Sequence, residues 1–308
     1  MDKIIIGIDL GGTHLRIGAV DLNNKIVNPI VIKTALIANA QNPLKELCDF
    51  IKRYIDDNNI ENVEAISIGV PSSVANDKET VICTTNIRNS KGEILFDNVN
   101  IAKDMQRYFN LPVFINNDVK NILAYDIVDN HLEKDSVVAG IYIGTGVGAA
   151  IVVNGRELDG ANGTALDLGH IPYFSGHAAC SCGKTGCCEC YASGWRLQEI
   201  RSAYYPDTKI EDMFTKHKDD KVMKDFIYAC AYVYSVIATI FNPSAIVVGG
   251  GVMEMKDFPQ AEFEKLVNEM TGKDVMKYGF KYVYSQEFIG KGVIGAAIFA
   301  RNRMSLCA

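Results

Sequence analysis

The sequence predicts an α/β protein built from two similar halves. Apolar strand-like runs alternate with helical patterns from about residue 43 onward, which is typical of α/β architecture. A glycine-rich loop follows an apolar strand near the N-terminus and again about half a chain later. The segments Ile6–Gly11 and Ala139–Gly144 also match in their apolar and glycine positions at an offset of 139 − 6 = 133 residues. This weak internal repeat favours a duplicated unit.

Length and charge narrow the class of protein. The chain has 308 residues, enough for two lobes that each bury a core. Its 31 Lys plus Arg against 37 Asp plus Glu give a net charge of −6, and no basic run is present, which argues against nucleic-acid binding. The uncharged stretches 136–155 and 226–253 are broken by glycines and by Asn242-Pro243, so we expect buried core and no membrane span. The N-terminus lacks a signal-peptide pattern, and we expect a cytoplasmic protein.

The elements of the first half follow from hydrophobic periodicity. A meander of three strands is expected first, over 3–9, 15–21 and 25–33. The elements that follow are a helix over 43–56, a buried strand over 63–70, a helix over 101–109, a strand over 112–115 and a helix over 121–131. The polar segment 71–98 is expected to be an irregular loop, and long ordered loops of this kind usually carry function.

The second half repeats the opening hairpin and then becomes more helical. Its expected strands are 138–143, 148–153, 245–248 and 281–285, and its expected helices are 195–203, 219–241, 259–270 and 292–303. A cysteine-rich excursion spans 154–193.

Three glycine loops each follow an apolar strand. They are Gly11-Gly12-Thr13, Gly144-Thr145-Gly146 and Gly249-Gly250-Gly251. Missing Cβ atoms let backbone N–H groups approach an anion such as a phosphate. Asp9 precedes the first loop and would face phosphates through a divalent cation. Each loop alone is equally compatible with a plain hairpin turn, but three of them favour nucleotide binding.

A carboxylate stands where ligands bind in α/β sheets. Asn116-Asn117-Asp118 follows the strand 112–115 and opens a helix. Asp118 is therefore either a helix N-cap or a general base at the carboxyl end of a strand, able to accept the proton of an attacking hydroxyl.

Five cysteines lie within eleven residues of the excursion, which in a cytosolic chain favours a metal site. His170, Cys180, Cys182 and Cys187 form a Cys3His set suited to a closed structural zinc site. Cys188 and Cys190 are alternative ligands. The three named cysteines are preferred because Gly183 and Gly186 allow the chain to fold back between Cys182 and Cys187.

Together these motifs resemble those of ROK-family sugar kinases, over a stretch that runs from Ile4 to the final helix. The segments that carry the resemblance are Asp9–Thr13, Asn117-Asp118, Gly144–Gly148, Leu168–Ile171, Cys180–Glu189 and Val248–Val252. Within the family the chain most resembles D-allose kinases, in Asn76–Thr80, Asp118-Val119, Tyr125–Val128 and Gly250–Met255 followed by Phe258-Pro259. N-acetylmannosamine kinases and glucokinases are the more distant alternatives.

The resemblance implies a duplicated actin-like ATPase (ribonuclease H-like) fold with two lobes around a cleft. The N-terminal lobe would span 1–118, with the C-terminal helix 291–308 packing back on it. The C-terminal lobe would span 119–290 and contain a zinc-binding loop, 165–190. The family resemblance also suggests a homodimer.

The resemblance further implies an ATP:hexose 6-phosphotransferase that uses ATP with Mg²⁺ and holds a structural Zn²⁺. Asp118 would be the catalytic base. The sugar would contact Asn86, Asn117, Asp118, Asp167, His170 and Glu189. The nucleotide, with its metal, would contact Asp9, Gly11, Gly12, Thr13, Gly144, Thr145, Gly146 and Gly249–Gly251.

One position departs from the family pattern. The family usually has Glu three residues before the zinc histidine, whereas this chain has Asp167, shorter by one methylene. The departure leaves the identity of the hexose open. ROK repressors, a class in the same family, carry a helix-turn-helix segment ahead of the first glycine loop, and only eight residues precede Asp9 here. A sugar sensor without catalysis would lack the base or the phosphate loops.

Overall fold

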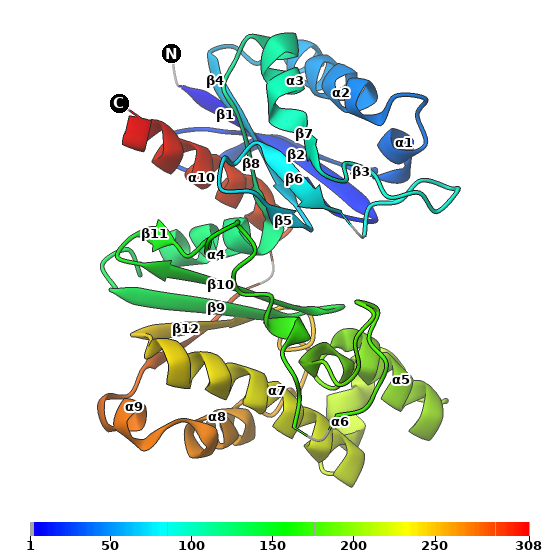
Figure 1. The fold of residues 1–308 in the computed structure, drawn as a ribbon, viewed down its shortest axis with the longest axis vertical. Helices are drawn as coiled ribbons and strands as arrows, with labels where there is room; N and C mark the ends of the chain where they lie inside the picture. Colours follow the sequence, from blue (N-terminus) through cyan, green and yellow to red (C-terminus); the bar gives the residue numbers. More distant parts are fainter. Residues whose placement is uncertain (1–2, 85, 175, 287, 308) are drawn as a thin grey trace. The chain divides into compact units, whose positions relative to one another are not determined.

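The computed structural model describes residues 3–84, 86–174, 176–286 and 288–307. Backbone contacts divide the chain into two compact units (Figure 1). Unit 1 comprises 1–128, 159–165 and 288–308, and unit 2 comprises 129–158 and 166–287. The predicted boundary at 118/119 differs from this division, because the helix that begins at Asp118 and the short segment 159–165 both belong to unit 1. The C-terminal helix returns to unit 1.

Unit 1 is built on a five-stranded sheet of order β3-β2-β1-β4-β8. Strands β1, β4 and β8 are parallel, and β1, β2 and β3 form the predicted antiparallel meander. Helices α2 and α3 cover one face and α10 the other (Figure 1). The bounds are β1 Ile4–Leu10, β2 His14–Val20, β3 Ile26–Lys33, α1 Ala35–Ala38, α2 Pro43–Asp57, β4 Val63–Val70, α3 Ile101–Phe109, β8 Val113–Asn117, α4 Asp118–Asp129 and α10 Lys291–Cys307.

The helices of unit 1 begin where the sequence supplies capping groups. Asn42 Oδ1 accepts a hydrogen bond from the backbone N–H of Lys45 at 3.1 Å, and Pro43 occupies the first helical position of α2. Asn100 caps α3 in the same way through Lys103 N, at 2.9 Å. These caps fix the helices against an apolar core whose largest members include Leu47, Ile51 and Ile66.

The expectation of an irregular loop over 71–98 is wrong. This segment, together with 99–100, contributes a second, three-stranded sheet of order β5-β6-β7, with bounds β5 Ser73–Val74, β6 Thr80–Cys83 and β7 Val99–Asn100. Val74, Val81 and Ile87 are buried in the unit 1 core. The strands are two to four residues long, too short for alternation to stand out among the polar residues around them.

Unit 2 repeats the sheet of unit 1, with order β11-β10-β9-β12-β13. Helix α7 lies along this sheet and α8 packs against α7 (Figure 1). The bounds are β9 Val137–Ile143, β10 Val147–Val153, β11 Arg156–Glu157, α5 Gly194–Tyr204, α6 Met213–His217, α7 Lys221–Phe241, β12 Ala245–Gly249, α8 Gln260–Met270, α9 Lys273–Tyr278 and β13 Lys281–Tyr284.

The duplication that the sequence predicts is present in the fold. The offset of 133 residues that places β1 on β9 (4 + 133 = 137) also places β2 on β10 (14 + 133 = 147). Both hairpins pair antiparallel, and both first strands continue into parallel pairing with a later strand. The loop between β1 and β2 and the loop between β9 and β10 therefore occupy equivalent places in their two units.

Within the part of the chain that the structure describes, one helix, α7, is long and apolar enough to cross a membrane by length and composition alone. However, 56% of its most apolar stretch is buried within the protein. Its side chains, among them Phe226, Tyr234 and Ile237, belong to the unit 2 core. The helix ends at Phe241, where Asn242 adopts a left-handed conformation.

Candidate active site

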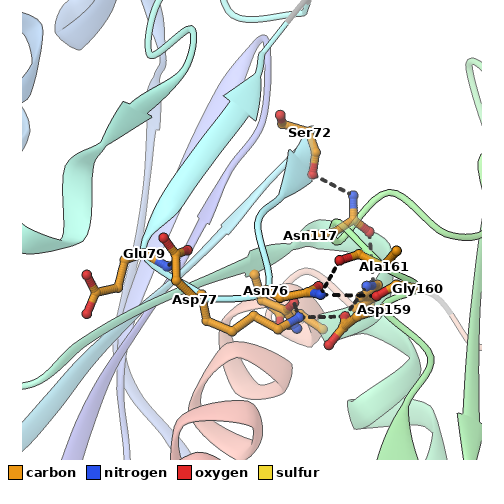
Figure 2. Close-up of polar contacts among 12 residues, drawn as sticks. Ser72, Asn76, Asp77, Glu79, Asn117, Asp159, Gly160 and Ala161 are labelled. Atoms are coloured by element: carbon orange, nitrogen blue, oxygen red, sulfur yellow. Dashed lines mark hydrogen bonds and ion pairs between the residues drawn. The ribbon is translucent and has the colours of Figure 1, made fainter.

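The junction between β8 and α4 presents the predicted base. Asn117 Oδ1 accepts a hydrogen bond from Lys120 N at 3.2 Å, so Asn117 and not Asp118 caps the helix. Asn117 Nδ2 donates to the backbone oxygen of Ser72 at 3.1 Å, which fixes the cap to the end of β4 (Figure 2). Asp118 is the first helical residue. Its carboxylate is therefore not committed to capping, and the N-cap alternative is wrong for this residue.

The carboxyl group of Asp118 is half-buried and lies close to a second acid. Its Oδ1 accepts a hydrogen bond from Val119 N at 2.8 Å. Burial, followed by the negative charge of Asp9, raises the pKa of Asp118 to about 7. A carboxyl group with such a pKa takes up a proton far more readily at neutral pH than an ordinary aspartate does.

Asp9 is the second-to-last residue of β1, just before the first glycine loop. Its Oδ2 accepts a hydrogen bond from Arg16 Nη1 at 3.0 Å. A Cβ atom on Gly292, near the start of α10, would lie 2.9 Å from Asp9 Cγ, so the carboxylate sits against the N-terminus of a helix, where the dipole favours an anion. Burial raises the pKa of Asp9, and the Arg16 guanidinium counteracts this effect.

The first glycine loop is held from within unit 1 and its middle is exposed. Gly11 N donates to His14 O at 3.0 Å, and Thr34 Oγ1 donates to Gly11 O at 2.6 Å. Gly12 and Thr13 are exposed. A Cβ atom on Gly12 would lie 2.6 Å from the backbone oxygen of Asn86, so this position has no room for a side chain. The close approach also places Asn86, whose side chain is exposed, next to the loop.

The second glycine loop, in unit 2, is held by the start of α5. Gly194 N donates to Gly144 O at 2.8 Å and Trp195 N donates to Thr145 O at 3.1 Å. Thr145 is exposed. Glu189 is tied to the same loop, because its Oε2 accepts from Val147 N at 3.0 Å.

The third glycine loop packs on the second. Gly250 has φ +92°, and a Cβ atom there would lie 2.6 Å from the backbone of Ile143. Val252 N also donates to Ile143 O at 3.0 Å. The loops 144–146 and 249–251 are therefore neighbours in unit 2, which the sequence did not reveal because about a hundred residues separate them.

The cysteine-rich excursion brings the four predicted metal ligands together. Single ligand atoms of His170, Cys180, Cys182 and Cys187 all lie within 4.8 Å of one another. Cys180 Sγ is 3.7 Å from His170 Nδ1, and Cys182 Sγ is 3.7 Å from Cys187 Sγ. A tetrahedral zinc with ordinary bond lengths requires about 3.8 Å between two sulfurs and about 3.6 Å between sulfur and nitrogen. The residues therefore fit a closed zinc site.

The alternative ligands Cys188 and Cys190 lie outside this group of four, although the Cys190 thiol is next to that of Cys180. Cys188 is fully buried in the unit 2 core, and Cys190 Sγ contacts the backbone oxygen of Ala179 at 3.6 Å. Gly183 and Gly186, which let the chain fold back between Cys182 and Cys187, have φ angles of +87° and +76°. Both values lie in the left-handed region that glycine adopts most easily.

Asp167 and His170 share one short turn. His170 Nε2 is 3.8 Å from Asp167 Oδ1, and the Asp167 side chain is 71% exposed. Because Nδ1 faces the cysteines, Nε2 is the ring nitrogen left for a partner other than a metal. Asp167, His170 and Glu189 belong to unit 2, whereas Asp9, Gly11–Thr13, Asn86, Asn117 and Asp118 belong to unit 1. That the two sets face a common ligand stays a prediction.

Sequence reasoning missed three charged residues beside the β8–α4 junction. Lys78 and Lys120 are buried, and both contact the carboxylate of Asp159. In the sequence, Asp159 is 39 residues from Lys120 and 81 residues from Lys78, so no local spacing predicts the cluster.

The repeated sheet, with a glycine loop in each unit, defines the class of fold. Solved ROK proteins, which have the actin-like ATPase fold, superpose on nearly the whole chain, and the fold prediction is confirmed. Residues 5–303 match the ROK family, and the chain belongs to this family.

Two curated relatives are named as sugar kinases. An N-acetyl-D-glucosamine kinase from Pectobacterium carotovorum subsp. carotovorum (strain PC1) is 27% identical, over 82% of this chain and 86% of its own length. A glucokinase from Thermotoga maritima is 26% identical, over 97% of this chain and 98% of its own length.

Two solved structures show the range of proteins that share the fold. A ROK family glucokinase from Streptomyces griseus, in complex with glucose and AMPPNP, has a TM-score of 0.76 at 24% identity and covers 97% of this chain and 99% of its own. A ROK family transcriptional regulator, a homologue of the E. coli MLC protein, has a TM-score of 0.82 at 22% identity and covers 97% of this chain and 78% of its own.

Proposed function

We propose that this ROK protein is an ATP-dependent sugar kinase that transfers the γ-phosphoryl group of ATP to the primary (C6) hydroxyl of a hexose. The observation that carries the proposal is the carboxyl group of Asp118. It does not cap the helix, it is half-buried, and its pKa is raised to about 7. Membership of a family with sugar kinase relatives supports the same reaction.

In unit 1, Asp118 would accept the proton of the hexose hydroxyl as it attacks the γ-phosphorus. Asn117 and Asn86 would hold sugar hydroxyls. Gly12 and Thr13 are exposed, and their backbone N–H groups would contact phosphate oxygens. Mg²⁺, bound with the nucleotide, would offset the triphosphate charge, and Asp9 would contact the water molecules around it.

In unit 2, the loop 144–146 would hold phosphates and the neighbouring loop 249–251 would hold the adenosine. Glu189, His170 and Asp167 would bind sugar hydroxyls. Glu189 would then serve two purposes, because its carboxylate also accepts from Val147 N and so fixes the end of the phosphate loop. Zinc on His170, Cys180, Cys182 and Cys187 would hold this part of unit 2 in place without an open position for catalysis.

D-allose is our first choice of hexose, with N-acetylmannosamine and glucose as alternatives. The relatives named above act on N-acetyl-D-glucosamine and glucose by name, and they do not single out allose. The short side chain of Asp167 favours a sugar whose hydroxyl reaches further toward it or binds through water.

We further expect the protein to be cytoplasmic and to form a homodimer. Size-exclusion chromatography with light scattering would show the homodimer as the mass of two chains.

A coupled ADP-release assay tests the function directly. Purified protein with ATP and Mg²⁺ is offered allose, glucose, mannose, N-acetylmannosamine and N-acetylglucosamine in turn. We expect hexose-dependent ADP release, with kcat/KM for the best sugar about tenfold or more above the others. Sugar binding without ADP release for any hexose would instead favour a sugar sensor without catalysis, and a protein named as a transcriptional regulator shares the fold.

Gly146→Ala is expected to weaken hexose binding with little loss of stability. A Cβ atom at residue 146 would lie 2.3 Å from Glu189 Oε2, the far end of a flexible side chain that can swing away. The KM for hexose should rise about tenfold as the Glu189 contact is lost. Gly272→Ala is the matched control, because its Cβ would meet only Thr239 Cγ2 at 3.6 Å. Equal KM values for both variants would contradict the role of Glu189.

A further inference from the structure

Two buried lysines share one carboxylate in unit 1. Lys78 is 2% exposed and Lys120 is 6% exposed. Lys78 Nζ is 2.7 Å and Lys120 Nζ 2.5 Å from Oδ1 of Asp159. Burying charged groups is costly unless they are paired, so this arrangement requires all three side chains to be in place.

Asp159 begins a segment, residues 159–165, that we term the strap. The chain belongs to unit 2 immediately before and after it, yet the strap itself belongs to unit 1. Asn76 Nδ2 donates to the backbone oxygens of Gly160 at 3.1 Å and Ala161 at 2.9 Å (Figure 2). A Cβ atom on Gly163 would lie 1.9 Å from Val74 O and 3.1 Å from the carbonyl carbon of Ala75, so the strap backbone lies directly against the end of β5 and the residue that follows it.

The lysines link the strap to both sides of the candidate base. Lys120 is in the first turn of α4, two residues after Asp118. Lys78 Nζ donates to Asn116 Oδ1 at 3.2 Å, and Lys78 O accepts from Ile115 N at 2.9 Å. Asn116 Nδ2 in turn donates to Asn121 Oδ1 at 3.0 Å. The carboxylate of Asp159 therefore contacts Lys120 directly and reaches Asn116 through Lys78, and these two residues flank the base.

The charge on Asp159 is stable around neutrality. Burial acts to raise the pKa of Asp159, but hydrogen bonds from Lys120 and Lys78 outweigh it and hold the pKa below its ordinary value. Protonation of Asp159 therefore contributes nothing to any change of activity near pH 7, where Asp118 titrates.

We propose that Asp159 is a positioning residue for catalysis: through Lys120 and Lys78 it anchors the strap to the β8–α4 junction and fixes the placement of Asp118. This inference rests on the proposed kinase function. The strap continues directly into the turn that carries Asp167 and His170. One anchor thus fixes the base and the start of a proposed sugar-binding segment, and its loss should affect the base first.

The test compares Asp159→Asn with Asp56→Asn. The control removes an ion pair of similar length on α2, Lys52–Asp56 at 2.8 Å, in which both side chains are 57% exposed. Amide hydrogen exchange of residues 115–121 is measured together with kcat as a function of pH. For Asp159→Asn we expect at least tenfold faster exchange in this segment, a kcat about tenfold lower and a pH midpoint moved below that of the wild type, because a displaced Asp118 is better solvated.

The pH midpoint separates positioning from general destabilisation. A smaller folded fraction lowers the amplitude of the kcat profile and leaves its midpoint unchanged. If Asp159→Asn does not fold, Asn76→Ala is the second variant, because it removes the two exposed hydrogen bonds to the strap. It should change hydrogen exchange, kcat and the pH midpoint in the same directions but by smaller amounts. Asp159→Glu, which keeps the charge, should recover most of kcat.

Unchanged exchange of 115–121 and an unchanged midpoint in Asp159→Asn, as in Asp56→Asn, would overturn the inference. Failure of the proposed function has a different signature, since the wild type would then release no ADP with any hexose. The hydrogen-exchange comparison would still decide whether Asp159 holds the β8–α4 junction.

Discussion

Replacing Asp118 with Asn is expected to lower kcat by about 10²–10⁴-fold while hexose affinity changes little. The amide keeps the shape of the side chain and the helix cap is supplied by Asn117, so the junction should retain its structure. What the variant loses is the group that accepts the hydroxyl proton. Steady-state kinetics in the coupled assay and calorimetric hexose titration measure the two quantities, and near-normal turnover would refute the role of Asp118.

The stability of the same variant supplies an internal control. Because the folded-state pKa of Asp118 is about 7 and the ordinary value is 3.8, the folded form binds the proton more tightly than the unfolded form. The stabilisation from this group is complete at pH values below its ordinary pKa and is lost as the pH rises through 7. Asp118→Asn lacks this loss, and its Tm relative to wild type should therefore increase between about pH 5 and about pH 8.

Loss of a proposed zinc ligand is the second large expected effect. Cys182→Ser removes one of the four proposed ligands from a loop that is otherwise held by turns and by the isolated bridges Pro172–Cys187 and Ala179–Thr185. The metal content should fall from about one zinc per chain toward zero, and Tm should fall by about 10 °C or more, because binding energy at a structural site is folding energy. Metal analysis and differential scanning calorimetry measure both.

Ser181→Ala, at the exposed neighbouring position, is the matched control for the cysteine variant. It should retain both zinc and Tm. A strong chelator applied to the wild type should reproduce the effect of Cys182→Ser. Fully stable, active wild-type protein that contains no zinc would contradict the Cys3His assignment.

The sequence predicted the parts of the fold that depend on long apolar runs. β1, β4, β9 and β12 are buried over nearly their whole length, and their runs of Ile, Val and Ala stand out without any knowledge of partners. The small sheet in the segment 71–100 was missed for the opposite reason. Its strands are very short, and Val74 and Val81 are buried by contacts that come from elsewhere in the unit 1 core.

The candidate site shows the same division. Glycine loops and clustered cysteines are local patterns, and the sequence identified them. Whether Asp118 caps α4 was open from the sequence, because either Asn117 or Asp118 can cap a helix. The hydrogen bond from Lys120 N to Asn117 Oδ1 identifies Asn117 as the cap, and the role of Asp118 as base stays a prediction. The contact of Glu189 with Val147 and the sharing of Asp159 by two lysines join residues far apart in sequence, and no spacing encodes them.

The pH dependence of kcat is the most direct test of the central claim that Asp118 is the catalytic base. Wild-type kcat, measured from about pH 5 to about pH 9 with saturating hexose and ATP, should rise with pH around a midpoint near 7, because the base acts only when it is deprotonated. The residual activity of Asp118→Asn should lack this rise. A wild-type profile that is flat across the range, or the same midpoint in the variant, would contradict the assignment.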